Sequence, residues 1–177
     1  MIANTAGRER AAPKLFVGVG NELQRDDGFG VWVARRMSQL LLPPDVEVFE
    51  AGTAGIDAAP VLEGRQLVVV ADAVDAGAEP GEIFRLTPQE LCPRAGPARM
   101  SLHDVHLLDA LDATHLLGVA PDKVLILAVQ VADVSLGIGL TPAVERSVAE
   151  VVRVAIEALE SRSPQPTDDA AHDDDLV

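Results

Sequence analysis

The sequence predicts a single α/β domain in which helices cover both faces of a twisted, mostly parallel β-sheet. Short apolar runs alternate along the chain with longer segments whose apolar residues recur at helical spacing, the pattern of a three-layer α/β/α domain. Two of the runs are apolar almost throughout, as expected for strands that are buried on both faces. The length of 177 residues fits one domain with its own core.

The two ends of the chain differ from its middle in composition. Residues 1–12 are small and polar, and residues 161–177 are rich in Pro and Asp without apolar periodicity. Such segments bury too little apolar surface to offset the entropy lost on ordering. We therefore expect a flexible N-terminal segment over 1–12, a folded domain over 13–160 and a disordered acidic tail over 161–177.

A buried strand and an amphipathic helix open the domain. The strand is expected over 15–19, where the run Leu-Phe-Val-Gly-Val has no charged residue. A helix is predicted over 27–42, and the pair Pro43-Pro44 ends it. The apolar stripe of this helix consists of Phe29, Val33, Met37, Leu40 and Leu41.

The second strand has a different pattern from the first and third. Residues 46–49 alternate between apolar and polar, which indicates a strand nearer the edge of the sheet. A glycine-rich turn over 51–55 and a short helix to about Gly64 lead to the apolar run 67–71. Asp72 follows this run, so an acid is expected at the end of a buried strand.

The second half of the domain contains a long loop. A strand is expected over 82–86, followed over 87–102 by a loop rich in Pro, Arg and Gly. Loops of this length in a compact domain are often functional. A helix is predicted to start near His103, and its apolar residues are Leu107, Leu108, Leu111 and Leu116.

The last strand and helix complete the three layers. Residues 124–131, VLILAVQV, are the strongest strand in the chain. Thr141 and Pro142 are expected to open a helix that reaches about Glu160, with Thr as N-cap and Pro in the first turn. The apolar stripe of this helix consists of Val144, Val148, Val151, Ala155 and Leu159.

Charge and composition exclude several classes of function. The formal net charge of -14 argues against binding to nucleic acid or to an anionic membrane, because both need clustered Lys and Arg. The single cysteine, Cys92, excludes a disulfide framework within the chain, and a structural thiol explains it better than a nucleophile. The chain has no apolar run of membrane-spanning length and no signal peptide, so we expect a cytoplasmic protein, monomeric at this size.

Two acids are expected to meet at one edge of the sheet. Ligands of open α/β sheets bind outside the carboxyl ends of the strands, where Asp27 and Asp72 would both lie if their strands are neighbours. Paired carboxylates need a cation or a shared proton, and a histidine nearby would complete a mixed site for a divalent metal. Each acid also has a simpler role: Asp27 could cap the helix that follows it, and Asp72 could bind turn amides.

Other chemistries lack their motifs. Leu23 stands where a dinucleotide-binding fingerprint that starts at Gly18 and Gly20 would need its third glycine, and there is no P-loop. The chain has neither a G-x-S-x-G nucleophile elbow nor an H-E-x-x-H zinc helix. A nucleotide-binding domain therefore rests only on Gly18 and Gly20 and on the fold, which is weak support.

Five segments, in the same order, resemble the nickel–iron hydrogenase maturation endopeptidases. From about Leu15 to Leu159 they are GVGNELQRDDGFGVWVARRM, EAGTAG, VVVADAV, SLHDVHLLDAL and GIGLTPAVE. The resemblance implies a five-stranded sheet flanked by helices. It also implies an endopeptidase that removes the C-terminal extension from the precursor of a hydrogenase large subunit after nickel has been inserted.

The resemblance also implies the site. The residues that match the family's nickel contacts are Asp27, Asp72 and His103. The resemblance implies that the ion arrives with the precursor and is shared with these three side chains. The loop at 51–53 matches a segment that the family uses for substrate choice or cleavage. His106 stands where the family often has a small residue, and it offers either a second ligand or a shift of the helix.

The residues leave the mechanism and one alternative function open. The metal could polarise the peptide carbonyl and activate a water molecule, or a carboxylate could act as general base. A non-enzymatic nickel-sensing chaperone that docks on the immature large subunit would use the same three residues. Only turnover of the precursor distinguishes this chaperone from an endopeptidase.

Overall fold

The computed structural model describes residues 12–53, 58–90 and 102–161, with side chains from Leu107 onward in the last range. Nearly all of the predicted terminal segments, most of the loop predicted over 87–102, and Cys92 lie outside these ranges. Among the helices in the described ranges, none is long and apolar enough to cross a membrane.

The described residues form one five-stranded sheet in the order β2-β1-β3-β5-β4. The first four of these strands run parallel, and β4 pairs antiparallel with β5 at the edge. This arrangement confirms the predicted fold class and places β1 beside β3, which the sequence could not show. The strands are β1 (Lys14–Val19), β2 (Val46–Gly52), β3 (Leu67–Val74), β4 (Ile83–Leu86) and β5 (Val124–Gln130).

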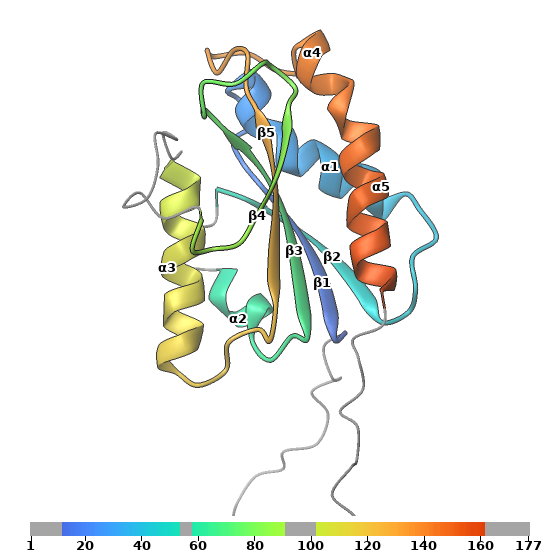
Figure 1. Ribbon diagram of the computed structural model, residues 1–177, viewed down its shortest axis with the longest axis vertical. Coiled ribbons are helices and arrows are strands. Elements are labelled where there is room, and N and C mark those ends of the chain that lie inside the picture. The colour runs from blue at the N-terminus through green and yellow to red at the C-terminus, as the bar shows by residue number, and fades with distance from the viewer. Residues whose placement is uncertain (1–11, 54–57, 91–101, 162–177) are drawn as a thin grey trace, which may run out of the picture.

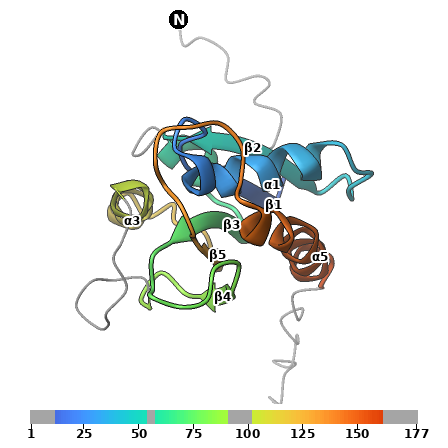
Figure 2. The same ribbon diagram turned by 90° about the horizontal axis from the view of Figure 1, so that it is seen from above.

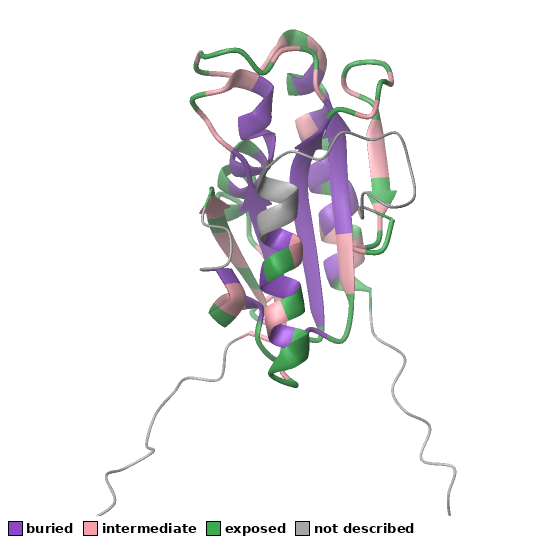
Figure 3. Cartoon of the chain, turned by 90° about the vertical axis from the view of Figure 1, so that its left-hand side faces the viewer, coloured by how far each residue is buried: buried purple, intermediate pink, exposed green. Residues whose placement is uncertain are grey.

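Helices cover both faces of the sheet (Figures 1 and 2). On one face α1 (Phe29–Ser38) and α5 (Ser147–Glu160) enclose an apolar core, and on the other face α2 (Ala59–Leu62) and α3 (Leu102–Leu116) enclose a second. Side chains of β3 alternate between the two cores, as the two-residue period of a strand requires. All eight residues of β3 are buried, which places this strand at the centre of the molecule (Figure 3).

Two helices differ from the sequence prediction at their ends. The helix predicted over 27–42 is preceded by the 3-10 turn η1 (Arg25–Gly28), begins at Phe29 and ends at Ser38. It stops before the prolines because the amides of Gln39 and Leu40 bond to carbonyls three residues back, which tightens the last turn. The last predicted helix is divided into α4 (Pro142–Glu145) and α5.

Thr141 does not cap the helix that follows it. It occupies the N-cap position with an extended backbone and Pro142 follows, as predicted, but its side chain makes no capping hydrogen bond. The hydroxyl instead donates to Oδ2 of Asp26 at 2.9 Å. A distant carboxylate therefore replaces the local backbone amide as the partner of this side chain.

Gly30 allows α1 to approach the sheet closely. A Cβ atom at this position would lie 2.1 Å from the carbonyl oxygen of Ala71 and 2.3 Å from that of Val19. No side chain fits these distances, so the first turn of α1 rests directly on the backbones of β1 and β3. The start of α1 is thus fixed at the carboxyl ends of two neighbouring strands.

Candidate functional site

The candidate site lies at the carboxyl edge of the sheet, at the top of Figure 1. Gly18 pairs with Ala71, so the loop after β1 and the end of β3 reach this edge together. The turn η1, which contains Asp27, contacts β3 directly. The structure therefore brings the segments of Asp27 and Asp72 to the same edge, as the sequence predicts for neighbouring strands.

Asp72 lies within β3, and the strand continues for two residues beyond it. Its side chain is buried, and Oδ1 accepts a hydrogen bond from the amide of Ala73 at 2.8 Å. Val70 and Val74, two residues to either side, pack in the core beneath α3. By the strand period, the Asp72 carboxylate points to the α3 side of the sheet.

Asp27 does not cap α1. Gly28 occupies the N-cap position of that helix, and no side chain caps it. The Asp27 carboxylate instead turns back into its own loop, where Oδ2 accepts a hydrogen bond from the amide of Asn21 at 3.2 Å. Gly20 has a φ of 132°, and a Cβ atom there would lie 1.9 Å from the backbone oxygen of Asp27, so only glycine permits this fold of the loop.

His103 is placed by its backbone alone. It is the second residue of α3, one turn before Leu107, and its side chain and that of His106 lie outside the described residues. Leu107 borders a small cavity together with Val19, Gly52 and Thr53, so the first turns of α3 stand at the carboxyl edge. Over the side chains that the structure describes, no three His, Cys, Asp or Glu form a metal-binding group.

Asp26 is a buried acid whose hydrogen bonds hold this edge together, and the sequence did not predict this role. Its carboxylate accepts hydrogen bonds from the amides of Ala132 at 2.9 Å, Asp133 at 3.0 Å and Thr141 at 2.6 Å, besides the Thr141 hydroxyl. Arg25, just before it, has a φ of 47°, a left-handed backbone that is uncommon for a side chain other than glycine. The only signal in the sequence was the doubled acid, and its partners lie more than a hundred positions away.

A hollow of about 300 Å³ opens beside the Asp27 loop. The loop after β1 forms one wall, and the end of β2, which includes the predicted substrate loop at Ala51, Gly52 and Thr53, forms the other. Arg35 joins the two walls, because its guanidinium bonds to Glu22 at 2.7 Å and to Glu50 at 3.1 Å. The hydrogen bond that it donates to Glu22 raises the pKa of Arg35.

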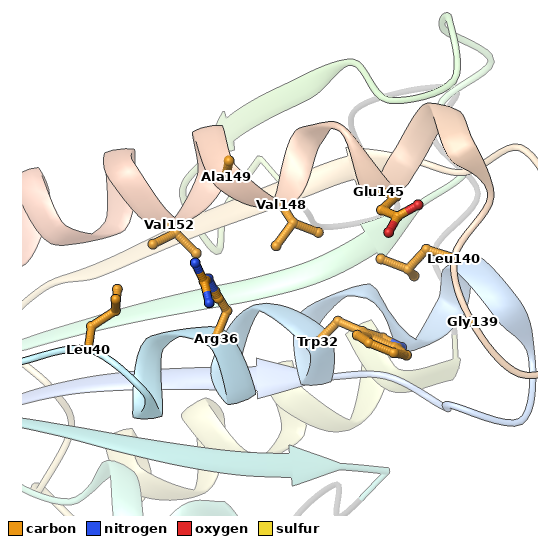
Figure 4. A pocket seen from close by; sticks show the side chains of 9 residues that line it. All are labelled: Trp32, Arg36, Leu40, Gly139, Leu140, Glu145, Val148, Ala149 and Val152. Atoms are coloured by element: carbon orange, nitrogen blue, oxygen red, sulfur yellow. The ribbon is translucent and has the colours of Figure 1, made fainter.

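A larger cavity than this hollow lies elsewhere. It is a groove of about 590 Å³ between α1 and α5, and Figure 4 shows Trp32 and Arg36 on one side of it and Val148 and Val152 on the other. Neither Asp27 nor Asp72 lines this groove. Volume alone would therefore place the functional site away from the acids.

Comparisons with known proteins agree with one another. Residues 31–158 match a family model described as hydrogenase maturation protease. The chain is 32% identical over 147 residues to the Hydrogenase 2 maturation protease of Escherichia coli, covering 82% of this chain and 89% of that protein. It is 31% identical over 165 residues to the hydrogenase expression/formation protein HupD of Rhodobacter capsulatus, covering 92% and 79%.

Solved structures give the same result. The hydrogenase maturating endopeptidase HybD of Escherichia coli superimposes with a TM-score of 0.75 at 30% identity, covering 82% of this chain and 91% of that one. The NiFe hydrogenase maturation protease HybD of Thermococcus kodakarensis superimposes with a TM-score of 0.69 at 26% identity, covering 84% and 99%. Fold and sequence thus point to the same group of proteins.

Proposed function

This chain belongs to the hydrogenase maturation protease family, and from that premise we propose that it removes the C-terminal extension from the nickel-loaded precursor of a hydrogenase large subunit. The observation that carries the proposal is the pair of buried carboxylates, Asp27 and Asp72, at the carboxyl edge of a sheet with this family's fold. Carboxylate oxygens are suitable ligands for a divalent metal ion. Two carboxylates at this edge therefore offer ligands to a cation delivered by the substrate.

We assign the contacts with the substrate's nickel to Asp27, Asp72 and His103. Carboxylate oxygen and imidazole nitrogen are both suitable donors for a divalent transition metal. The Asp72 side chain points to the side of the sheet where α3 begins, and His103 is in the first turn of α3. In this arrangement the three side chains bind the precursor only when it carries nickel, and the peptide bond is positioned after that contact forms.

The hollow beside the Asp27 loop is our candidate for the place where the C-terminal extension enters. It is open, it lies at the same edge as the acids, and Gly52 and Thr53 line it. Hydrolysis then requires a water molecule activated either by the nickel ion or by a carboxylate acting as general base. Both routes require the scissile carbonyl close to the carboxylates of Asp27 and Asp72.

Substitution of the two acids tests the site. We expect Asp27→Asn and Asp72→Asn to slow cleavage of nickel-loaded precursor by about a hundredfold or more, the usual cost of removing a general base or a metal contact. The cleavage is followed by intact mass of the precursor, and thermal unfolding reports whether each variant is folded. Asp122→Asn is the matched control, because Asp122 is exposed and lies before β5 at the opposite edge.

The chaperone alternative makes a different prediction from the same assay. A nickel-sensing chaperone would bind the precursor and release it at full mass, whereas the endopeptidase shortens it by a discrete C-terminal peptide. A double variant, Asp27→Asn with Asp72→Asn, that still cleaves at the wild-type rate contradicts the site assignment.

A further inference from the structure

A cluster of exposed apolar side chains borders the candidate site. Isolated apolar residues on a surface are ordinary, but a contiguous group of large ones usually marks an interaction site. We call this group the apolar rim, and its members, with their exposed fractions, are Leu23 (62%), Val134 (47%), Leu136 (82%) and Ile138 (81%).

The backbone joins the two segments of the apolar rim. The amide of Gly137 donates to the carbonyl oxygen of Leu23 at 2.9 Å, and the amide of Arg25 donates to the carbonyl oxygen of Gly137 at 3.0 Å. Gln24 and Gly137 accordingly pair as a parallel bridge. Leu23 and the segment 136–138 are therefore side by side in space although they are far apart in sequence.

Asp26 holds the loop of the apolar rim at both ends. Its carboxylate bonds to the amides of Ala132 and Asp133 before the rim and to Thr141 after it. Arg25 adds an ion pair with Asp133 at 3.2 Å. The rim is thus presented by a loop that internal bonds already order, so binding a partner costs little further ordering of the backbone.

The apolar rim is continuous with the proposed substrate site. Leu23 is four residues before Asp27 and also lines the hollow that contains Gly52 and Thr53. In Figure 2 the segment between β5 and α5 arches over the same end of the molecule as the loop after β1. A protein whose C-terminal segment occupied the hollow would place its neighbouring surface on the rim.

We propose that the apolar rim is the docking surface for the body of the precursor, which it binds through an apolar patch next to the cleaved segment. This inference rests on the proposed function, and it names the part of the chain that supplies affinity rather than chemistry. Apolar area of this kind is the main source of affinity in a protein interface.

The test compares two double variants in cleavage of nickel-loaded precursor. Leu136→Ser with Ile138→Ser removes the most exposed part of the rim. Leu116→Ser with Leu117→Ser is the matched control, because these leucines are 88% and 74% exposed at the far end of α3. All four side chains are exposed, so both variants should keep the wild-type unfolding temperature.

We expect the rim variant to raise KM about tenfold or more, because each buried leucine or isoleucine contributes roughly that factor to affinity. The value of kcat should stay within about twofold of wild type, since Asp27 and its loop are unchanged. The control variant should match wild type in both constants. An unchanged KM in the rim variant overturns the inference.

Two further measurements separate the docking role from the cleavage step and from self-association. Binding of precursor to an Asp27→Asn chain, with and without the rim substitutions, shows whether the rim matters even when nothing is cut. If wild type binds the precursor but leaves it intact, the proposed function fails, while the effect of the rim on binding still decides the present inference.

Sedimentation of the chain alone tests for self-association. A wild-type dimer that the rim substitutions dissociate, with precursor binding unchanged, overturns the docking role.

Discussion

Asp26 and Asp27 are adjacent in sequence and have different surroundings in the structure. Asp26 is fully buried and accepts hydrogen bonds from the segment that follows β5. Asp27 accepts a hydrogen bond from the amide of Asn21 in its own loop. We infer that Asp26 holds the edge together, and we assign the contact with the substrate's metal to Asp27.

Removal of the Asp26 carboxylate should therefore destabilise the fold. Asp26→Ala leaves the amides of Ala132, Asp133 and Thr141 without this acceptor, and we expect the free energy of unfolding to fall by about 2–5 kcal/mol. Thr141→Val is the milder control, because it removes only the hydroxyl bond and should cost about 1 kcal/mol. Urea unfolding measures both, and a loss below about 0.5 kcal/mol in Asp26→Ala would contradict the role.

Asp133 gives the loop of the apolar rim a dependence on pH. A hydrogen bond from the amide of Ser135 holds the pKa of the Asp133 carboxyl below its ordinary value of 3.8. Because the folded pKa is lowered, this bond stabilises the loop above pH 3.8 and loses its effect as the pH falls through the lower, folded value. A carboxyl titration by NMR should show a midpoint below 3.8 that rises in Ser135→Pro, which lacks the amide donor. An unchanged midpoint in that variant rules out the amide as the cause.

The residues of the candidate site were only partly predictable. The apolar runs of β1 and β3 are visible in the sequence, so the segments that carry Asp27 and Asp72 could be identified, although β3 continues two residues beyond Asp72. The resemblance to a family supplied the role expected of the two acids. Asp26 and Thr141 could not be understood in this way, because each is the other's partner across more than a hundred positions. A helix cap is predicted from the local sequence pattern, and at Thr141 a long-range hydrogen bond to Asp26 takes the place of the capping bond.

Among the elements, α1 is the one that fixes the site, because its first turn rests on the ends of β1 and β3. Gly30 makes this contact possible through its distances to the Ala71 and Val19 carbonyl oxygens. The strands β1, β3 and β5 were predicted from apolar runs, since burial on both faces leaves a strong pattern, whereas β2 was predicted from its alternation of apolar and polar residues. Helix ends were predicted less well. The end of α1 depends on a tight last turn, and the residue before α4 bonds to Asp26 instead of capping the helix.

The close approach of α1 predicts a large effect for one added methyl group. Gly30→Ala would force α1 away from the sheet, and we expect the free energy of unfolding to fall by about 3 kcal/mol or more, with cleavage slowed because Asp27 moves with the helix. Gly64→Ala is the matched control: no atom lies within 4 Å of its Cβ position, so only the positive φ of 65° opposes it, at about 1 kcal/mol. Equal losses in the two variants would contradict the contact.

At the scale of the whole molecule, the strand order brings together segments whose proximity no local sequence pattern shows. The order β2-β1-β3-β5-β4 brings the loop after β1, the end of β3 and the start of α3 to one edge. Pairing between strands depends on packing across the entire sheet, and no short segment contains it. The membership of a protease family and the geometry of this edge are the two grounds for our proposal that Asp27 and Asp72 receive a metal carried by a protein substrate.

This mechanism is tested most directly by offering the chain a hydrogenase large-subunit precursor with and without nickel and following its intact mass. We predict that a discrete C-terminal peptide is lost from the nickel-loaded form, while the nickel-free form keeps its full mass. Equal cleavage of both forms would contradict the role of nickel at Asp27 and Asp72. A loaded precursor that binds and is never shortened would contradict the proposed function itself.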